Sequence, residues 1–147
     1  MSDMQATDVY VPSDEELRRI LEETKTIAVV GLSPKPHRDS YAVAKYLQAH
    51  GYRIIPVNPK GVDVLEEHCY PSLADIPPEI EIDVVDVFRR AEETPPVARA
   101  AVERGAKVLW LQLGIVNDEA RDVAESAGLQ VVMGACMKVE HRRLEGA

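Results

Sequence analysis

Hydroxyl and cationic side chains gather in the loop that follows an apolar, β-branched run ending at Val30. The loop runs from Gly31 to Ser40, where an amphipathic helical pattern begins. A strand, a glycine turn and a helix start in this order direct backbone N–H groups and the positive end of the helix dipole toward an anion. So many donors suit a ligand with more than one phosphate, although a solvated loop with scattered charge is the alternative. The candidate contacts are Gly31, Leu32, Ser33, Lys35, His37, Arg38 and Ser40.

A second polar segment, Val57-Asn58-Pro59-Lys60, follows the next apolar run. Proteins that bind NAD usually have an acidic residue here, which takes the ribose 2′-hydroxyl, and a Gly-x-Gly-x-x-Gly pattern in the first loop. In this chain Gly31 alone remains of the three glycines, and Lys60 stands where an acid is expected. A lysine suits a ribose that carries its own phosphate, as in NADP or in the 3′-phosphoadenosine of coenzyme A (CoA). An ordinary Asn-Pro turn with an exposed lysine is the alternative.

Side chains at the ends of the third and fourth apolar runs complete the candidate site. Phe88 and Arg89 follow the third run, where the ring could line a crevice and the guanidinium could reach a phosphate. Gln112 and Gly114 follow the fourth run and place an amide and a small residue there. The alternatives are a core phenylalanine, a solvated arginine and a glycine that only turns the chain.

No arrangement typical of catalysis or metal binding is apparent. The sequence has no Gly-x-Ser-x-Gly, Walker lysine or His-Glu-x-x-His motif, and Cys69 and Cys136 lie far apart without ligand spacing. Cys136 stands at the start of the last helical segment, whose dipole would stabilise a thiolate, but a buried unreactive cysteine is the more common case. The Glu92-Glu93 pair, and His141 beside Glu140, are interpreted as solvated surface charges. We therefore predict no catalytic residue and no metal site.

The net charge of −8 disfavours nucleic acid and anionic membranes as partners, because both require a large basic surface. A small anion is still compatible with it, because a few local cations outweigh a distant field. The five tyrosines, one tryptophan and one phenylalanine are too few for a platform that stacks bases. No segment is long and apolar enough to span a bilayer and no export signal is visible, so a cytoplasmic protein is expected.

Strand-like and helix-like segments alternate along the 147 residues. This alternation predicts an α/β fold, with a Rossmann-like, doubly wound, five-stranded parallel sheet in a single domain. We expect the strand order 3-2-1-4-5 and a ligand crevice at the carboxyl ends of the first and fourth strands. The predicted strands are 26–31, 52–57, 81–88, 107–113 and 129–134, and the predicted helices are 13–23, 40–50, 95–104, 118–127 and 136–144.

Residues outside these elements also carry local signals. Residues 1–12 are expected to form an N-terminal arm, with the domain spanning 13–147. Ser13 together with Glu16, Thr94 and Asn117 have the side chains that cap helices. The proline-rich stretch before the third strand is expected to be a long loop with one helical turn near Ser72–Ile76.

Four segments together resemble the small stand-alone CoA-binding proteins, a family similar to the CoA-binding domain of the succinyl-CoA synthetase alpha subunit. The segments are VVGLSPKPHRDSYAVAKYLQAHGYRIIPVNP, DVVDVFRR, VLWLQLGI and CMKVEHRRL. The resemblance covers about residues 13–145, and it implies that the domain is a CoA-binding one.

The resemblance also implies which residues would contact CoA. Gly31 to Ser40 would hold the pyrophosphate, and Val57, Asn58, Pro59 and Lys60 would hold the adenosine end and its 3′-phosphate. Val87, Phe88 and Arg89 would flank the nucleotide, and Gln112 to Gly114 would border the pantetheine arm.

Two segments depart from the family's pattern. Gly134-Ala135 stand before the cysteine where the family commonly has Asp-Arg, so an arginine near the thiol end of CoA is missing. Val64–His68 lacks the glycine expected in a tight turn after the second strand. The phosphorylated histidine of the ligase belongs to a second domain, which is not part of this sequence.

Together these features predict non-catalytic binding of CoA or acyl-CoA, in a carrier, sensor or sequestering role. One alternative is an NADP-dependent oxidoreductase that uses the same loops, which the missing glycines disfavour. Another is a regulatory or interaction subunit with a vestigial nucleotide crevice, which would bind a protein partner. CoA is the only cofactor predicted, and the chain is expected to be a monomer or a homodimer.

Overall fold

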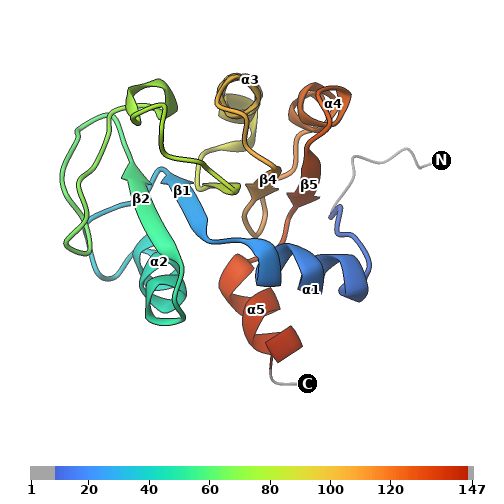
Figure 1. Ribbon diagram of the computed structural model, residues 1–147, viewed down its shortest axis with the longest axis horizontal. Coiled ribbons are helices and arrows are strands. Elements are labelled where there is room, and N and C mark those ends of the chain that lie inside the picture. The colour runs from blue at the N-terminus through green and yellow to red at the C-terminus, as the bar shows by residue number, and fades with distance from the viewer. Residues whose placement is uncertain (1–8, 146–147) are drawn as a thin grey trace.

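Five parallel strands form one sheet in the computed structural model, which describes residues 9–145 (Figure 1). The Rossmann-like α/β fold predicted from the alternating pattern is confirmed. Among the described residues no helix is long and apolar enough to cross a membrane. The strands are β1 (Thr26–Val30), β2 (Arg53–Val57), β3 (Val84–Val87), β4 (Val108–Leu111) and β5 (Gln130–Met133). The helices are α1 (Asp14–Glu23), α2 (Asp39–Ala49), α3 (Thr94–Glu103), α4 (Asp118–Ser126) and α5 (Met137–Glu145), with short 3₁₀ turns η1 (Leu73–Asp75) and η2 (Ala91–Glu93).

The strand order is β2-β1-β3-β4-β5, so the predicted order 3-2-1-4-5 is wrong. β2 lies at an edge of the sheet and contains Pro56, which has no N–H to donate to a second neighbouring strand. β3 lies between β1 and β4, and every one of its residues is buried. The direction of strand addition therefore reverses between β1 and β3. In folds of this kind a ligand binds at that reversal, so the crevice is expected there and not at the first and fourth strands.

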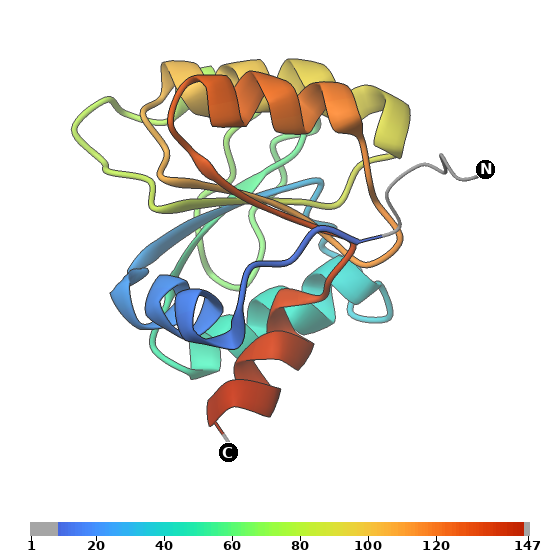
Figure 2. The ribbon, with the colours of Figure 1, turned by 90° about the vertical axis from the view of Figure 1, so that its right-hand side faces the viewer.

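Two layers of helices cover the sheet (Figure 2). α1, α2 and α5 lie on one face, and α3 and α4 lie on the other. The chain moves across the sheet in one direction from β1 to β2 and in the opposite direction from β3 through β4 to β5. Because all these crossovers are right-handed, α2 lies on one face of the sheet, and α3 and α4 lie on the other. On the face with α5, Trp110 is fully buried, and its ring N–H donates to the Ala135 carbonyl (2.8 Å).

The chain before α1 lies against β5. Tyr10 and Met133 exchange two backbone hydrogen bonds (2.9 and 2.8 Å), and the Tyr10 hydroxyl donates to Glu125 (2.6 Å). Residues 1–8 of the predicted arm lie outside the described residues. The remainder of that arm is docked on the free edge of β5.

Two of the predicted helix caps are confirmed and one is wrong. The Ser13 hydroxyl accepts a hydrogen bond from the Glu16 N–H (3.2 Å), and Asn117 accepts one from the first turn of α4 (2.8 Å). Thr94 is the first residue of α3 and not its cap, because η2 has already turned the chain before it. The Thr94 hydroxyl donates instead to the Ala91 carbonyl (2.7 Å).

His141 is buried, so its interpretation as a surface charge beside Glu140 is wrong. Its Nδ1 lies 2.9 Å from the Tyr46 hydroxyl, which joins α5 to α2. Glu140 pairs with Arg143 instead (2.8 Å). Burial lowers the pKa of His141, so the neutral ring is favoured at this position.

The connection from β2 to β3 contains a tight turn made without glycine. Leu65 and Glu66 both have left-handed backbone (φ 54° and 63°), and Val64 and Glu67 exchange hydrogen bonds across them (3.2 and 2.9 Å). Left-handed backbone is unfavourable for such residues, and the packing of Leu65 against the core offsets this cost. Further along, η1 confirms the helical turn predicted near Ser72–Ile76.

Arg104 holds the second half of this connection against the end of α3. Its two terminal nitrogens donate to four backbone carbonyls, those of Leu73 (2.9 Å), Ile76 (2.8 Å), Pro77 (3.2 Å) and Ile80 (3.1 Å). The segment has little regular secondary structure, so these bonds satisfy carbonyls that a helix or strand would otherwise pair.

Replacing Arg104 with Met should lower the free energy of unfolding by at least about 2 kcal/mol, because hydrogen bonds to a charged group contribute about 1.5–3 kcal/mol each. Urea denaturation followed by circular dichroism measures the loss. Arg99 of α3 is the control, since its exposed ion pair with Glu119 (3.5 Å) contributes at most about 1 kcal/mol. Equal losses in Arg104→Met and Arg99→Met would mean that the four carbonyl contacts add nothing.

Candidate functional site

The carboxyl ends of β1, β2 and β3 surround a cavity of about 390 Å³, here called the first cavity. It lies where the direction of strand addition reverses, so the loops after β1 and β3 leave toward opposite faces and open a crevice between them. Most of the residues predicted from the sequence as ligand contacts lie around it. The lining residues are Gly31, Leu32, Ser33, Pro34, Lys35, Arg38, Asn58, Pro59, Lys60, Val62, Phe88 and Arg89.

The other predicted contacts lie elsewhere. Val57 lines a smaller adjoining cavity of about 180 Å³, and Gln112 lines a larger one of about 610 Å³, here called the second cavity. His37 and Gly114 line none of these three cavities. Ser40 is buried, and its hydroxyl accepts a backbone N–H from the start of the loop (3.0 Å). Ser40 therefore holds the shape of the loop after β1.

Gly31 brings this loop into direct contact with the end of β3. Its backbone has φ +88°, and its N–H donates to the Val57 carbonyl (2.8 Å). A Cβ at this position would lie 2.4 Å from the Phe88 carbonyl oxygen. Both the backbone conformation and the lack of space therefore require glycine here.

Asn58 ties the loop after β2 to the loop after β1. Its side-chain N–H donates to the Leu32 carbonyl (3.0 Å), and its side-chain oxygen accepts the backbone N–H groups of Lys60 (3.1 Å) and Gly61 (3.0 Å). The Asn-Pro turn predicted from the sequence is thus present, and it fixes the position of Lys60 relative to the first loop.

Lys35, Arg38 and Lys60 line the first cavity together. All three are exposed, and within residues 9–145 none of them makes an ion pair with an acidic side chain. They come from two loops that the sequence separates widely. The cavity is therefore rimmed by positive charge that is not neutralised locally, in a chain whose net charge is −8.

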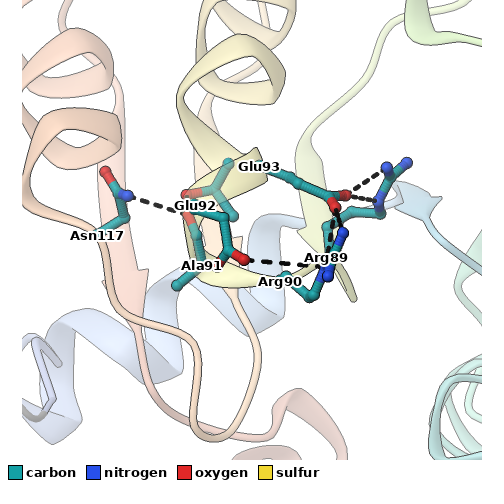
Figure 3. Close-up of polar contacts among 7 residues, drawn as sticks. Arg89, Arg90, Ala91, Glu92, Glu93 and Asn117 are labelled. Atoms are coloured by element: carbon teal, nitrogen blue, oxygen red, sulfur yellow. Dashed lines mark hydrogen bonds and ion pairs between the residues drawn. The ribbon is translucent and has the colours of Figure 1, made fainter.

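Arg89 and Arg90 are both bound by Glu93, as Figure 3 shows. One carboxylate oxygen accepts from Arg89 Nε (2.9 Å), and the other accepts from Arg90 Nη2 (2.7 Å). These hydrogen bonds lower the pKa of Glu93. The interpretation of Glu93 as a solvated charge is therefore wrong, and Arg89 meets the first cavity with its charge partly neutralised. Asn117 donates to the Ala91 carbonyl (3.0 Å) and so anchors the turn that carries Glu93.

The second cavity lies between α2 and α5, at the carboxyl ends of β3 and β4. It adjoins the first cavity, because Phe88 and Arg89 line both. Cys136 also lines the second cavity. It is half-buried, whereas the more common case named above is a fully buried cysteine. The lining residues are Asp39, Ala42, Val43, Phe88, Arg89, Arg90, Gln112, Leu113, Ile115, Cys136, Lys138, Val139 and Arg142.

Asp86 is a polar residue of this region that is not among the predicted contacts. It lies in the middle of β3 with no exposed surface, and one carboxyl oxygen accepts a hydrogen bond from Gln112 Nε2 (2.6 Å). The other oxygen has no partner among the described residues. Removal from water raises the pKa of Asp86 to about 7, against the smaller lowering effect of Gln112. An acidic residue inside the apolar run VVDV is the signal that could have identified it.

Three comparisons relate the chain to known proteins. A sequence model of the CoA binding domain family matches residues 25–142. The uncharacterized protein YneT of Bacillus subtilis (strain 168) is 45% identical over 130 residues, which cover 88% of this chain and 95% of YneT. A hypothetical protein from Pyrococcus horikoshii OT3 superimposes with a TM-score of 0.89 and 46% identity, covering 99% of this chain and 100% of that one. ADP-forming acetate–CoA ligase II of Archaeoglobus fulgidus is 33% identical over 103 residues, which cover 69% of this chain and 15% of the ligase.

Replacing Gly31 with Ala should destabilise the domain by at least about 2 kcal/mol, because it adds a steric clash to a left-handed backbone that alone costs about 1–2 kcal/mol. The matched control is Gly114→Ala, where φ is +82° but no atom lies within 4 Å of the added Cβ. Urea denaturation of the two variants separates the clash from the backbone cost. A loss in Gly31→Ala no greater than that in Gly114→Ala contradicts the close contact with β3.

The pH dependence of stability should report the buried carboxyl of Asp86. Its pKa of about 7 in the folded chain lies above the value of about 3.9 in an unfolded chain, so the folded state binds the proton more tightly. The stability due to this proton is complete below about pH 4 and is lost as the pH rises through 7. Wild type should therefore lose on the order of 2 kcal/mol relative to Asp86→Asn between pH 5 and pH 8. Parallel curves of unfolding free energy against pH for the two proteins over this range would contradict the raised pKa of Asp86.

Proposed function

We propose a function for this chain on the premise that it belongs to the CoA-binding domain family, whose sequence model covers residues 25–142. The chain binds CoA or an acyl-CoA in the two cavities at the carboxyl ends of its strands. It holds this ligand without transforming it. Carrying, sensing or sequestering CoA are the roles that such binding serves.

The observation that carries this proposal is the group of three cations around the first cavity. Lys35, Arg38 and Lys60 lie around one space and have no acidic partner within residues 9–145. CoA carries two groups of phosphates, the pyrophosphate and the 3′-phosphate of the ribose. Lys35 and Arg38 belong to the loop that precedes α2, where a pyrophosphate gains from the helix N-terminus as well. Lys60 belongs to the other loop and takes the 3′-phosphate.

The second cavity accommodates the rest of the ligand. It adjoins the first cavity through Phe88, and its walls include apolar side chains such as Val43 and Ile115. A pantetheine arm is uncharged, and its apolar parts fit against these side chains, while its amide groups can reach the polar residues of the same lining. The ligase relative is named for joining acetate to CoA, and a CoA-binding role of the matching segment in that enzyme is consistent with this placement.

The alternatives predict different ligands. An NADP-dependent oxidoreductase would use Lys60 for the 2′-phosphate, and it would need a nicotinamide site in the second cavity. A regulatory subunit with a vestigial crevice would have filled cavities, whereas the two cavities here measure about 390 and 610 Å³. The open cavities favour a ligand site over a vestigial crevice.

Charge reversal at Lys35 or Arg38 should weaken CoA binding by at least about 10-fold, because one charge-assisted hydrogen bond contributes about 1.5–3 kcal/mol. Isothermal titration calorimetry at fixed salt measures the change. Lys45→Glu is the matched control, because this exposed lysine of α2 lines neither cavity. CoA affinity that is unchanged in both Lys35→Glu and Arg38→Glu removes the first cavity from the proposal, and tighter binding of NADP than of CoA favours the oxidoreductase.

The role of Lys60 is tested with dephospho-CoA, which lacks the 3′-phosphate. Wild type should bind CoA about 10-fold more tightly than dephospho-CoA, since one charge-assisted contact is lost. In Lys60→Ala this difference should disappear, while affinity for dephospho-CoA stays as in wild type. A difference that survives in Lys60→Ala assigns the 3′-phosphate to another residue.

A further inference from the structure

Asp86 lies in β3 two residues before Phe88, which lines the second cavity. In the sheet it pairs with Val29 of β1 on one side and with Trp110 of β4 on the other. Side chains alternate between the two faces of a strand, so Asp86 and Phe88 lie on the same face, as do Trp110 and Gln112. Phe88 and Gln112 line the second cavity, and on that face Asp86 is the next residue below Phe88, beside Trp110 below Gln112.

Gln112 connects Asp86 to the cavity. It is only 3% exposed, and its one side-chain hydrogen bond within residues 9–145 is the 2.6 Å bond from Nε2 to Asp86. When Asp86 is ionised, its carboxylate can only accept hydrogen bonds, so it holds the amide with its NH₂ group turned inward. The amide carbonyl oxygen is then directed away from Asp86. Gln112 consequently offers the cavity an acceptor and not a donor.

This acceptor stands out among the polar groups of the second cavity. The cationic side chains that line it, those of Arg89, Arg90, Lys138 and Arg142, can only donate. Apart from Gln112, the one strong side-chain acceptor in the lining is the exposed carboxylate of Asp39, at the start of α2. Gln112 is therefore the buried side-chain acceptor that a ligand N–H can meet in this cavity, and Asp39 is the exposed one.

We propose that Asp86 is a positioning residue, which fixes the Gln112 amide so that its carbonyl oxygen accepts an amide N–H from the arm of the bound ligand. The inference rests on the proposed function, since the pantetheine arm of CoA supplies such amide groups. Without Asp86 the Gln112 amide can rotate and present its NH₂ group equally well. The geometry thus selects arms that contain a hydrogen-bond donor near the sheet.

The energetic cost of Asp86 supports a role beyond packing. A fully buried carboxyl with one unpartnered oxygen destabilises a fold, and an apolar residue of similar size in β3 would avoid this cost. The carboxyl makes one hydrogen bond in the described chain, and that bond goes to a residue of the cavity wall. The role that fits this cost is therefore the orientation of the Gln112 amide.

The test compares CoA with adenosine 3′,5′-bisphosphate, which lacks the arm, at pH 8 where Asp86 is ionised. Asp86→Val removes the acceptor for Gln112 and should weaken CoA binding about 5-fold, the loss of one hydrogen bond, while binding of the bisphosphate is unchanged. Gln112→Leu should give the same pattern, and the double variant should lose no more than either single one, because both disrupt one contact. Asp86→Asn retains an acceptor oxygen and should restore most of the CoA affinity. If Asp86→Val does not fold, Asp86→Ala adds no atoms to the core and makes the same comparison.

The outcomes separate this inference from the proposed function. Equal weakening of CoA and bisphosphate binding in the Asp86 variants means a structural role and overturns the inference. Unchanged CoA affinity in both Asp86→Val and Gln112→Leu also overturns the inference, but it leaves the proposed binding of CoA intact. If wild type binds neither CoA nor the bisphosphate, the proposed function fails and the inference fails with it.

Discussion

The close approach of Gly31 to the Phe88 carbonyl determines where the candidate site forms. Because no side chain intervenes, the loop after β1 lies directly on the end of β3, and the first cavity opens beside this contact. Asn58 fixes the same loop from the other side through its bond to the Leu32 carbonyl. The three loops after β1, β2 and β3 are therefore one structural unit. A larger residue at position 31 would separate them and would move the cations of the two loops apart.

The electrostatics of the first cavity are decided locally. The chain carries a net charge of −8, yet Lys35, Arg38 and Lys60 have no acidic partner in the described part of the chain. At physiological ionic strength, interactions between exposed charges are screened over about 8 Å, so distant carboxylates reduce the potential at the cavity only slightly. Arg89 differs from these three, because Glu93 already binds its guanidinium. In the proposed function, the attraction for phosphate thus depends on the loop cations more than on the arginine pair.

Features encoded by neighbouring residues could be predicted from the sequence, and features that depend on distant contacts could not. The Ser13 cap and the polar loops after the strands follow from residues close in the chain, and they were predicted correctly. The strand order was predicted wrongly, although Pro56 in β2 and the apolar composition of β3 both favour the observed order. The burial of His141 depends on Tyr46, 95 residues away, and no local pattern reveals this contact. The ion pair between Arg89 and Glu93, by contrast, joins residues four apart, so it could have been predicted from the sequence.

The two cavities differ in what they require of a ligand, and this difference explains why a buried acid is tolerated in β3. Exposed cations attract phosphate, but they are flexible and accept any polyphosphate of suitable size. A buried amide is more selective, because a ligand that leaves the Gln112 carbonyl without a donor incurs the cost of an unsatisfied polar group. That selectivity requires the amide to have one orientation, and Asp86 is the group that imposes it. Removing the carboxyl would make the core more stable at alkaline pH and would, by the same change, release the amide.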